Sequence, residues 1–278
     1  MMFRVALLLT TLLSANAFQS ALPTRVGSSS SSSLCMSTIA VIGASGLTAQ
    51  ECVYRALEQG YDVVGLTRNP ANVVIPQGSG GAKAGQPLVN DKLTVIGGDV
   101  TKKEDVAKVF EAADDIEGVI IALGGKTADV GESMLTDGTS NVIAAMKDKG
   151  IKRMAVVTSI GAGDSESQAP FMFKMLMMTV MKKIFVDKNN QEKVTQASGL
   201  DYCIVRPGGL TVEPPTGIIN VIDGEAGSIT RADVAEFCLD AVTMPDFPYL
   251  QQAPCISSVG GTSWTKDRSA KARGEGTM

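Results

Sequence analysis

A short segment has the residue types and the spacing that phosphate binding requires. Residues 37–60 read STIAVIGASGLTAQECVYRALEQG, with Gly43 and Gly46 between an apolar run and a helical pattern. Gly43 permits a tight exit from a strand, Gly46 leaves room for a pyrophosphate, and the small Ala49 lets the helix pack close to the strand. The first amides of the helix would face the phosphates. In isolation the motif also fits an ordinary turn, but its position between strand and helix predicts a dinucleotide site.

The next strand is expected over 62–66, and Thr67 and Arg68 follow it. An NAD-binding protein usually carries an acidic residue there, roughly twenty residues after the turn, for the ribose 2′-hydroxyl. A guanidinium instead pairs with a 2′-phosphate, which a carboxylate would repel. Arg68 therefore favours NADP(H) as the cofactor, and the alternative is a solvated loop residue.

The elements that must position these residues alternate along the chain. Further strands are expected over 93–96, 118–123 and 153–158, and helices over 104–113 and 138–149. Strand and helix repeated in this order predict an α/β fold, a Rossmann-type doubly wound parallel sheet in a single domain. We place this domain, with a small substrate-side region, at 37–262 and a flexible tail at 263–278.

Residues that follow the expected strands are candidate ligand contacts. Asp99 and Val100 follow the third strand, where this kind of fold often contacts adenine. Thr101 is expected to cap the next helix in a capping box with Glu104. Gly124 follows the fourth strand, where a missing side chain lets the backbone approach a ribose or a nicotinamide.

Composition narrows the function classes. The chain has 278 residues, 44% of them hydrophobic, which supplies an ample core for one large domain. A formal charge of −4 without a basic cluster argues against nucleic acid as a partner. The absence of histidine excludes His-based triads and His-ligated zinc. No metal site is expected, because the cysteines lack C-x-x-C spacing and read as buried reduced thiols: Cys35, Cys52, Cys203, Cys238 and Cys255.

The first 36 residues are predicted to be targeting sequence. Residues 1–17 have a basic start, an apolar run too short to span a bilayer and a small-residue cleavage pattern, as in a signal peptide. Residues 18–36 are serine-rich, contain Arg25 and lack acidic residues, as in a transit peptide. The junction at Ala17 and Phe18 resembles the bipartite presequences of algae with secondary plastids. A plastid location is therefore expected, with the secretory pathway as the alternative.

Several motifs together carry a family resemblance: GASGLTA, GDV, TSIGAG, SGLDYCIVRPGGL and GSITRADVAEFCLDAV. From Thr38 to Val242 the chain resembles atypical short-chain dehydrogenases/reductases, specifically NmrA-like NAD(P)-binding proteins, which include biliverdin/flavin reductase-like and plastid members. The resemblance implies that Ser159 lies near the nicotinamide and that the turn 206–209 shapes the substrate side. It also implies a helix from Ser228 that packs against the nucleotide half.

One departure from the wider superfamily concerns its Tyr-x-x-x-Lys pair. In that pair a tyrosine donates a proton and a lysine lowers the pKa of the tyrosine while holding the ribose. Lys188 occupies the lysine position, so the tyrosine position is Ile184, which has no proton to donate. Lys188 is expected to bind the ribose or, alternatively, to be a surface residue.

The complete site prediction has a catalytic and a cofactor part. Ser159 and Lys188 are the catalytic candidates. The predicted cofactor contacts are Gly43, Ser45, Gly46, Leu47, Thr48, Arg68, Asp99, Val100, Leu123, Gly124, Thr158, Lys188 and Pro207.

A methionine-rich segment, 171–186, is apolar around most of a helical circumference. It could line a pocket for a flat hydrophobic substrate, or contact a membrane surface or a protein partner. The alternative is a helix that covers the mouth of the site and packs on the core. Lysines at 174, 182 and 183 interrupt it, so no transmembrane span is expected.

Two functions fit these observations. The first is an NADPH-dependent reductase of a conjugated small-molecule acceptor, such as a flavin or a quinone, which needs little acid catalysis. The second is a non-catalytic NADP(H)-binding protein of the plastid that senses redox state or assists assembly. The missing tyrosine favours the second function, whereas Ser159, Lys188 and the turn at 206–209 favour the first.

Overall fold

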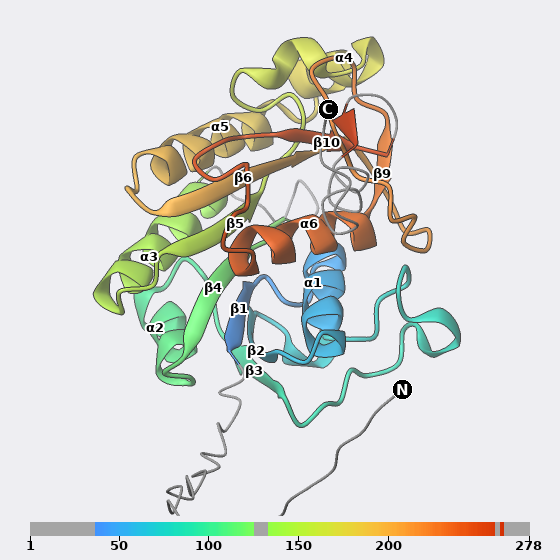
Figure 1. Ribbon diagram of the computed structural model, residues 1–278. Coiled ribbons are helices and arrows are strands. Elements are labelled where there is room, and N and C mark those ends of the chain that lie inside the picture. Colours follow the sequence, from blue (N-terminus) through green and yellow to red (C-terminus); the bar gives the residue numbers. More distant parts are fainter. Residues whose placement is uncertain (1–36, 125–132, 259–261, 264–278) are drawn as a thin grey trace, which may run out of the picture. The chain divides into compact units, whose positions relative to one another are not determined.

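The computed structural model describes residues 37–124, 133–258 and 262–263 (Figure 1). The predicted signal peptide and transit segment at 1–36 lie outside the described residues. Of the predicted tail, Ser263 belongs to a short strand, and 264–278 lie outside the description.

Nine strands of the described residues form one sheet in the order β11-β8-β10-β6-β5-β4-β1-β2-β3. The neighbours from β3 to β10 pair in parallel, whereas β8 and β11 are antiparallel at the far edge. The direction of winding reverses between β1 and β4, and ligands of doubly wound sheets bind at such a point. The Rossmann-type prediction is confirmed. The strands are β1 Thr38–Ile42, β2 Asp62–Thr67, β3 Leu93–Gly97, β4 Ile116–Ile121, β5 Arg153–Val157, β6 Asp201–Pro207, β8 Asn220–Val221, β10 Cys255–Ser257 and β11 Thr262–Ser263.

Helices cover both faces of the sheet (Figure 1). One face carries α1 and α6, and the other carries α2, α3 and α5. A separate two-stranded parallel sheet joins β7 to β9. The bounds are α1 Leu47–Glu58, α2 Lys103–Glu111, α3 Met134–Asp148, α4 Phe171–Met178, α5 Lys182–Gln196, α6 Arg231–Thr243, β7 Gly209–Thr211 and β9 Ser228–Thr230, with short 3-10 turns at Pro70–Asn72, Gly81–Lys83 and Ser165–Gln168.

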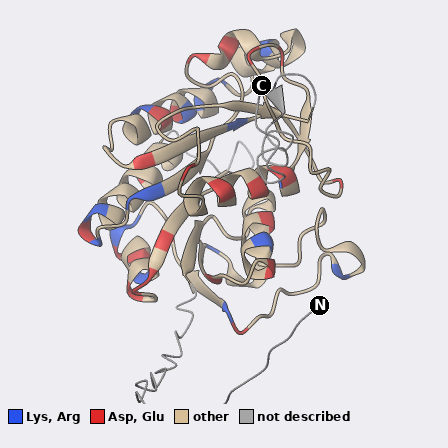
Figure 2. Ribbon diagram, in the orientation of Figure 1, with Lys and Arg blue, Asp and Glu red and all other residues tan. Residues whose placement is uncertain are grey.

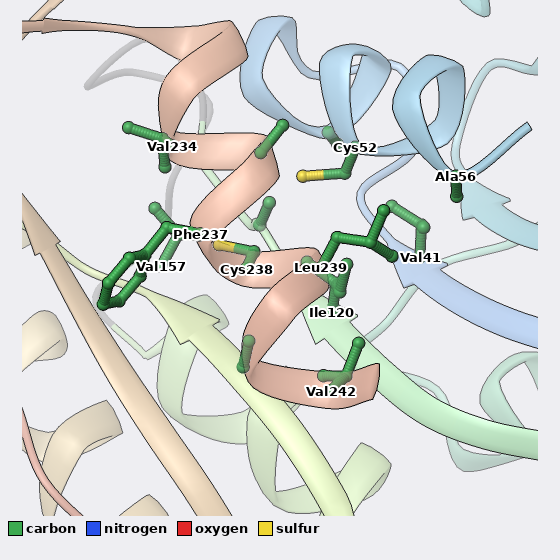
Figure 3. Close-up of a cluster of buried hydrophobic side chains, with 14 of the residues drawn as sticks. Val41, Cys52, Ala56, Ile120, Val157, Val234, Phe237, Cys238, Leu239 and Val242 are labelled. Atoms are coloured by element: carbon green, nitrogen blue, oxygen red, sulfur yellow. The ribbon is translucent and has the colours of Figure 1, made fainter. Parts of the chain in front are cut away.

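The core lies on both sides of the central strands because successive strand residues point to opposite faces. Val41 and Ile120 pack under α1 and α6, where Cys52 and Cys238 face each other (Figure 3). Helix α6 approaches closely because β4 carries a glycine: a Cβ at Gly118 would lie 2.6 Å from the Cβ of Val242. The buried reduced thiols are confirmed at every predicted cysteine but Cys35, which lies outside the described residues.

The predicted capping box at Thr101 is wrong. Helix α2 begins at Lys103 with Lys102 as its N-cap. The Thr101 hydroxyl instead donates to Asp99 Oδ1 at 2.8 Å. The Asp105 carboxylate accepts the Asp99 N–H at 2.9 Å and so fastens the turn before the helix.

The predicted helix start at Ser228 is also wrong. Residues 228–230 form β9, and Thr230 caps α6 by accepting the Asp233 N–H at 3.0 Å. Other bounds shift by a few residues; α3, for example, begins at Met134 instead of residue 138.

The methionine-rich segment forms two helices. Helix α4 ends at Met178, and α5 begins at Lys182 after a short joint. Among the described residues, no helix is both long and apolar enough to cross a membrane.

Candidate functional site

The glycine turn after β1 has the geometry that its residue types predict. Gly43 adopts φ +90°, and a Cβ there would lie 2.8 Å from the Ala122 carbonyl oxygen. The Gly43 and Ala44 amides donate to the Leu66 carbonyl at 2.9 Å each, which fastens the turn to β2. At Gly46 a Cβ would lie 3.2 Å from the Gly43 carbonyl oxygen. The Gly43 position therefore requires glycine, whereas the Gly46 position leaves little room for a side chain.

The N-terminus of α1 fits an anion. Gly46 is its N-cap, and no side chain among the described residues caps it. The first amides of a helix have no intrahelical acceptor, and together with the helix dipole they favour a phosphate. The pyrophosphate of a dinucleotide therefore fits this turn, and Leu47 and Thr48 contribute amides of this first turn.

Side-chain hydrogen bonds tie the glycine turn to the segment after β2. The Gln50 side-chain amide donates to the carbonyl oxygens of Ser45 at 2.9 Å and Asn72 at 2.8 Å. The hydroxyls of Ser45 and Thr67 are 2.6 Å apart. The turn that would hold the pyrophosphate and the segment that carries Arg68 are therefore one hydrogen-bonded unit.

A pocket of about 370 Å³ lies at the carboxyl ends of β1, β2 and β4. This is the switch point of the sheet, where the fold is expected to bind ligands. Sequence reasoning identified eight of its residues: Gly43, Ser45, Gly46, Arg68, Asp99, Val100, Leu123 and Gly124. It missed Leu66, Thr67, Gly98, Thr101, Ala122 and Met134, most of which are immediate chain neighbours of the predicted residues.

Arg68 is exposed and lines this pocket beside Asp99. Hydrogen bonds from the amide and the hydroxyl of Thr101 lower the pKa of Asp99, and the charges of Lys102 and Arg68 act in the same direction. The pocket therefore contains a fixed carboxylate at the start of the 99–101 turn and a guanidinium at the end of β2.

The other predicted residues do not line this pocket. Leu47 and Thr48 begin α1, and Lys188 lies on α5. Thr158, Ser159 and Pro207 lie at the ends of β5 and β6. Lys188 Nζ donates to the Thr158 carbonyl at 2.9 Å. The Pro207 carbonyl accepts the Ile160 N–H at 3.0 Å, and the half-buried Ser159 donates its hydroxyl to the Ile160 carbonyl at 3.0 Å. Since β5 pairs with β4, these residues lie next along the sheet from the strand that leads to Leu123 and Gly124. The alternative that Lys188 is a surface residue is therefore wrong, because its side chain is partly buried and bonded to Thr158.

The environment of Lys188 changes its acidity. Burial lowers the pKa of Lys188 to about 8, although the negative charges of Glu192 and Asp187 oppose this shift. Ile184, one turn earlier, is 8% exposed and packs on Leu135. The position of the usual tyrosine is therefore filled by apolar packing.

Asp187 anchors this part of α5. Its carboxylate accepts the amides of Leu135 at 2.8 Å and Thr136 at 3.0 Å, in the first turn of α3. Helices α3 and α5 are thereby held together beside Lys188.

Sequence reasoning missed a buried ion pair. The carboxylate of Glu192 accepts two hydrogen bonds from Arg206, at 2.7 and 3.1 Å, and their side chains are 2% and 5% exposed. Burial acts to lower the pKa of Arg206, but the hydrogen bonds and charges of Glu192 and Asp164 outweigh it and raise that pKa. Glu192 also accepts the Thr158 hydroxyl at 2.7 Å, so the pair supports the residue that binds Lys188. No local sequence signal links a residue of α5 to one of β6.

Charge over the rest of the described chain is mixed. Figure 2 shows Lys and Arg interspersed with Asp and Glu over the helices and strands. Among the described residues, no cluster of cysteine and acidic side chains is suited to a metal ion.

Comparison with known proteins identifies the domain. A family model described as NAD(P)H-binding matches residues 43–245, most of the chain. An uncharacterised chloroplastic protein of Arabidopsis thaliana is 32% identical over 214 residues, 73% of this chain and 70% of that protein. A second chloroplastic Arabidopsis protein is 26% identical over 258 residues, 83% and 73% of the two chains.

Solved structures show the same fold. An anaerobillin reductase of Escherichia coli O157:H7 is 27% identical with a TM-score of 0.62, covering 80% of this chain and 97% of that one. A short-chain dehydrogenase/reductase of Veillonella parvula, solved with NADP, has a TM-score of 0.63 at 16% identity, covering 82% and 97%.

Proposed function

The chain belongs to the NAD(P)H-binding family, and from this premise we propose that it is an NADPH-dependent reductase of a flat conjugated acceptor, such as a flavin or a quinone. The observation that carries this proposal is the pocket at the switch point, with a glycine cradle at one end and Arg68 at the end of β2. The anaerobillin reductase relative supports the acceptor class.

Arg68 supports NADPH over NADH. A guanidinium pairs with a 2′-phosphate through charge-assisted hydrogen bonds, whereas it has no such partner in NADH. The backbone N–H of Asn69 donates to the Thr67 hydroxyl at 3.3 Å, and that hydroxyl also contacts the hydroxyl of Ser45. The backbone on either side of Arg68 is thereby positioned toward the glycine turn.

Lys188 and Ser159 are the residues of this chain that we assign to the nicotinamide end. When bound, the reduced nicotinamide supplies a hydride, and the acceptor takes up a proton to complete its reduction. The Lys188 ammonium, whose pKa is about 8, binds the ribose and holds a transferable proton near neutral pH. Ile184, one turn before Lys188 on α5, packs on Leu135.

The test is a titration of the full chain with NADPH, NADP, NADH and NAD, followed by addition of flavins and quinones while the NADPH absorbance is recorded. A charged hydrogen bond contributes about 1.5–3 kcal/mol, so NADPH should bind roughly 10–100-fold more tightly than NADH. Arg68→Ala should remove this preference. Lys149→Ala, an exposed change at the C-terminal end of α3, is the control and should keep it. Equal binding of the two nucleotides would contradict the role of Arg68.

A second function, a non-catalytic NADP(H)-binding protein that senses redox state or assists assembly, is favoured by Ile184 in place of a tyrosine. Under this alternative NADPH binds but no acceptor oxidises it. The same titration therefore separates the two functions.

We also propose a plastid location, which two chloroplastic relatives support. Residues 1–36 fused to a fluorescent protein should direct it to the plastid in an alga with secondary plastids. Secretion of the fusion would instead support the signal peptide alone.

A further inference from the structure

Helix α4 and the joint that follows it carry an unusual concentration of exposed apolar side chains. Seven of the twelve exposed large apolar residues among the described residues lie within 171–186. Phe171 and Met172 are 72% and 77% exposed, and Met178 and Val180 are 60% and 68% exposed. Large exposed apolar patches on a soluble domain mark interaction sites. We name this surface the α4 face; its residues are Phe171, Met172, Met175, Leu176, Met178, Val180 and Val186.

The core does not account for this face, because α4 already has a buried one. Met177 is 8% exposed and packs with Ala162, Ala169 and Phe185, while Phe173 joins them. Residues 172 and 176 are one turn apart on the outward side. A helix that is apolar all round is normally covered all round. Within the described part of the chain, helix α4 is covered on its inner side only.

The charged side chains within 171–186 have one sign. Lys174, Lys182 and Lys183 lie within 171–186, and this segment contains no acidic residue, although the whole chain has a formal charge of −4. The Lys174 ammonium donates to the Ser167 carbonyl at 3.1 Å. Basic residues beside exposed methionine, leucine and phenylalanine are the composition of a segment that lies at an anionic lipid interface.

A pocket of about 400 Å³ opens beside this face. Five residues of the segment 171–186 line it: Met177, Met178, Lys182, Phe185 and Val186. Its methionine, phenylalanine and valine side chains suit the hydrocarbon of a lipid, and its charged residues are one lysine, Lys182, and one glutamate, Glu166.

We propose that the α4 face docks the protein on the surface of a membrane that contains anionic lipids. The apolar side chains enter the boundary between headgroups and acyl chains, and Lys174 and Lys182 face the anionic headgroups. Helix α4 is only eight residues long, so it lies on the surface and does not span the bilayer. This proposal is independent of the proposed reductase function.

The test is flotation of the full chain with vesicles of phosphatidylcholine, with and without phosphatidylglycerol. Phosphatidylglycerol should strengthen binding, and salt should weaken it. The double variant Phe171→Gln/Met172→Gln should reduce bound protein at least about tenfold, given the transfer free energy of two large apolar side chains. Lys182→Gln should weaken binding about fivefold on anionic vesicles only.

Controls separate docking from folding and from catalysis. Val89→Gln changes another highly exposed apolar residue, 87% exposed and outside the α4 face, and should leave flotation unchanged. The thermal midpoint and the NADPH affinity should be the same in all these variants, because the substituted side chains are exposed and none lines the nucleotide pocket. Because each variant keeps residues 1–36, any lipid binding by that segment is common to all of them.

Equal flotation of the Phe171→Gln/Met172→Gln variant and the unchanged chain would overturn the proposal. So would binding that is independent of phosphatidylglycerol and of Lys182. Unchanged flotation together with loss of self-association or of acceptor turnover in the double variant would assign the α4 face to a protein contact or to the substrate, and would also overturn it.

Discussion

The buried pair of Glu192 and Arg206 makes a quantitative prediction about stability. Replacing Arg206 with methionine keeps most of its aliphatic stem but leaves the Glu192 carboxylate, 2% exposed, without its cation. Removing one partner of such a pair costs about 3–5 kcal/mol, because the remaining charge stays buried and unpaired. For a domain of this size, each kcal/mol lowers Tm by roughly 2–4 °C, so the expected decrease is about 6–20 °C.

The matched control is Arg55→Met. Arg55 also pairs with a glutamate, Glu236 at 2.9 Å, but these side chains are 30% and 25% exposed. Partly exposed pairs contribute about 1 kcal/mol or less, so this variant should lose little stability. Urea denaturation followed by circular dichroism gives the free energy of unfolding of both variants on one scale.

A double variant tests the cause. Arg206→Met/Glu192→Met removes both charges, and it should recover much of the stability that Arg206→Met alone loses. If Arg206→Met cost no more than Arg55→Met, or if the double variant were as unstable as the sum of the single variants, burial of an unpaired charge would not be the cause.

Further predictions concern Gly43, Lys188 and Gln50. Gly43→Ala should lower the free energy of unfolding by about 1–2 kcal/mol because of the positive φ alone, and by more because of the 2.8 Å approach to the Ala122 oxygen. It should also weaken NADPH binding at least about tenfold, measured by calorimetry. Gly224→Ala is the control and should change neither quantity, because a Cβ there meets open space. The NADPH Kd should rise as pH increases through about 8, because a Lys188 ammonium whose pKa is lowered loses its proton there, and Lys188→Met should flatten this profile. The same shift means that the folded chain binds fewer protons than the unfolded chain between about pH 8 and the ordinary lysine pKa of about 10.4, so the contribution of Lys188 to stability should rise with pH across that window in denaturation experiments. Gln50→Leu should reduce the NADPH-to-NADH preference and cost about 1–2 kcal/mol of stability, because it unties the glycine turn from the segment after β2; an unchanged preference would contradict this coupling.

Local signals in the sequence were enough to predict the parallel sheet and most of the residues that line the candidate nucleotide pocket. Alternating apolar and helical patterns require the strand–helix order, and Gly43 and Gly46 can do what few other residues can at a tight turn. The residues that follow each parallel strand gather at one edge, so a position after a strand is enough to place Arg68 and Asp99 in the pocket. These inferences use only local signals and the connection rules of such sheets.

Simple motif rules failed where another contact replaced the one that the motif predicts. Thr101 and Glu104 have the spacing of a capping box, but Asp99 binds the Thr101 hydroxyl, and the helix begins later. The apolar run from 171 reads as one helix, yet α4 ends at Met178 with a non-helical Thr179, and α5 begins at Lys182.

Tertiary structure alone decided the chemistry around Lys188. Its spacing from Ile184 is visible in the sequence, but its hydrogen bond to Thr158 and its lowered pKa depend on how α5 packs against the end of β5. The pairing of Glu192 with Arg206 likewise joins residues of two elements that no local pattern connects. Electrostatic interactions depend on distance in space and on burial, which are properties of the folded chain and not of neighbouring residues in the sequence.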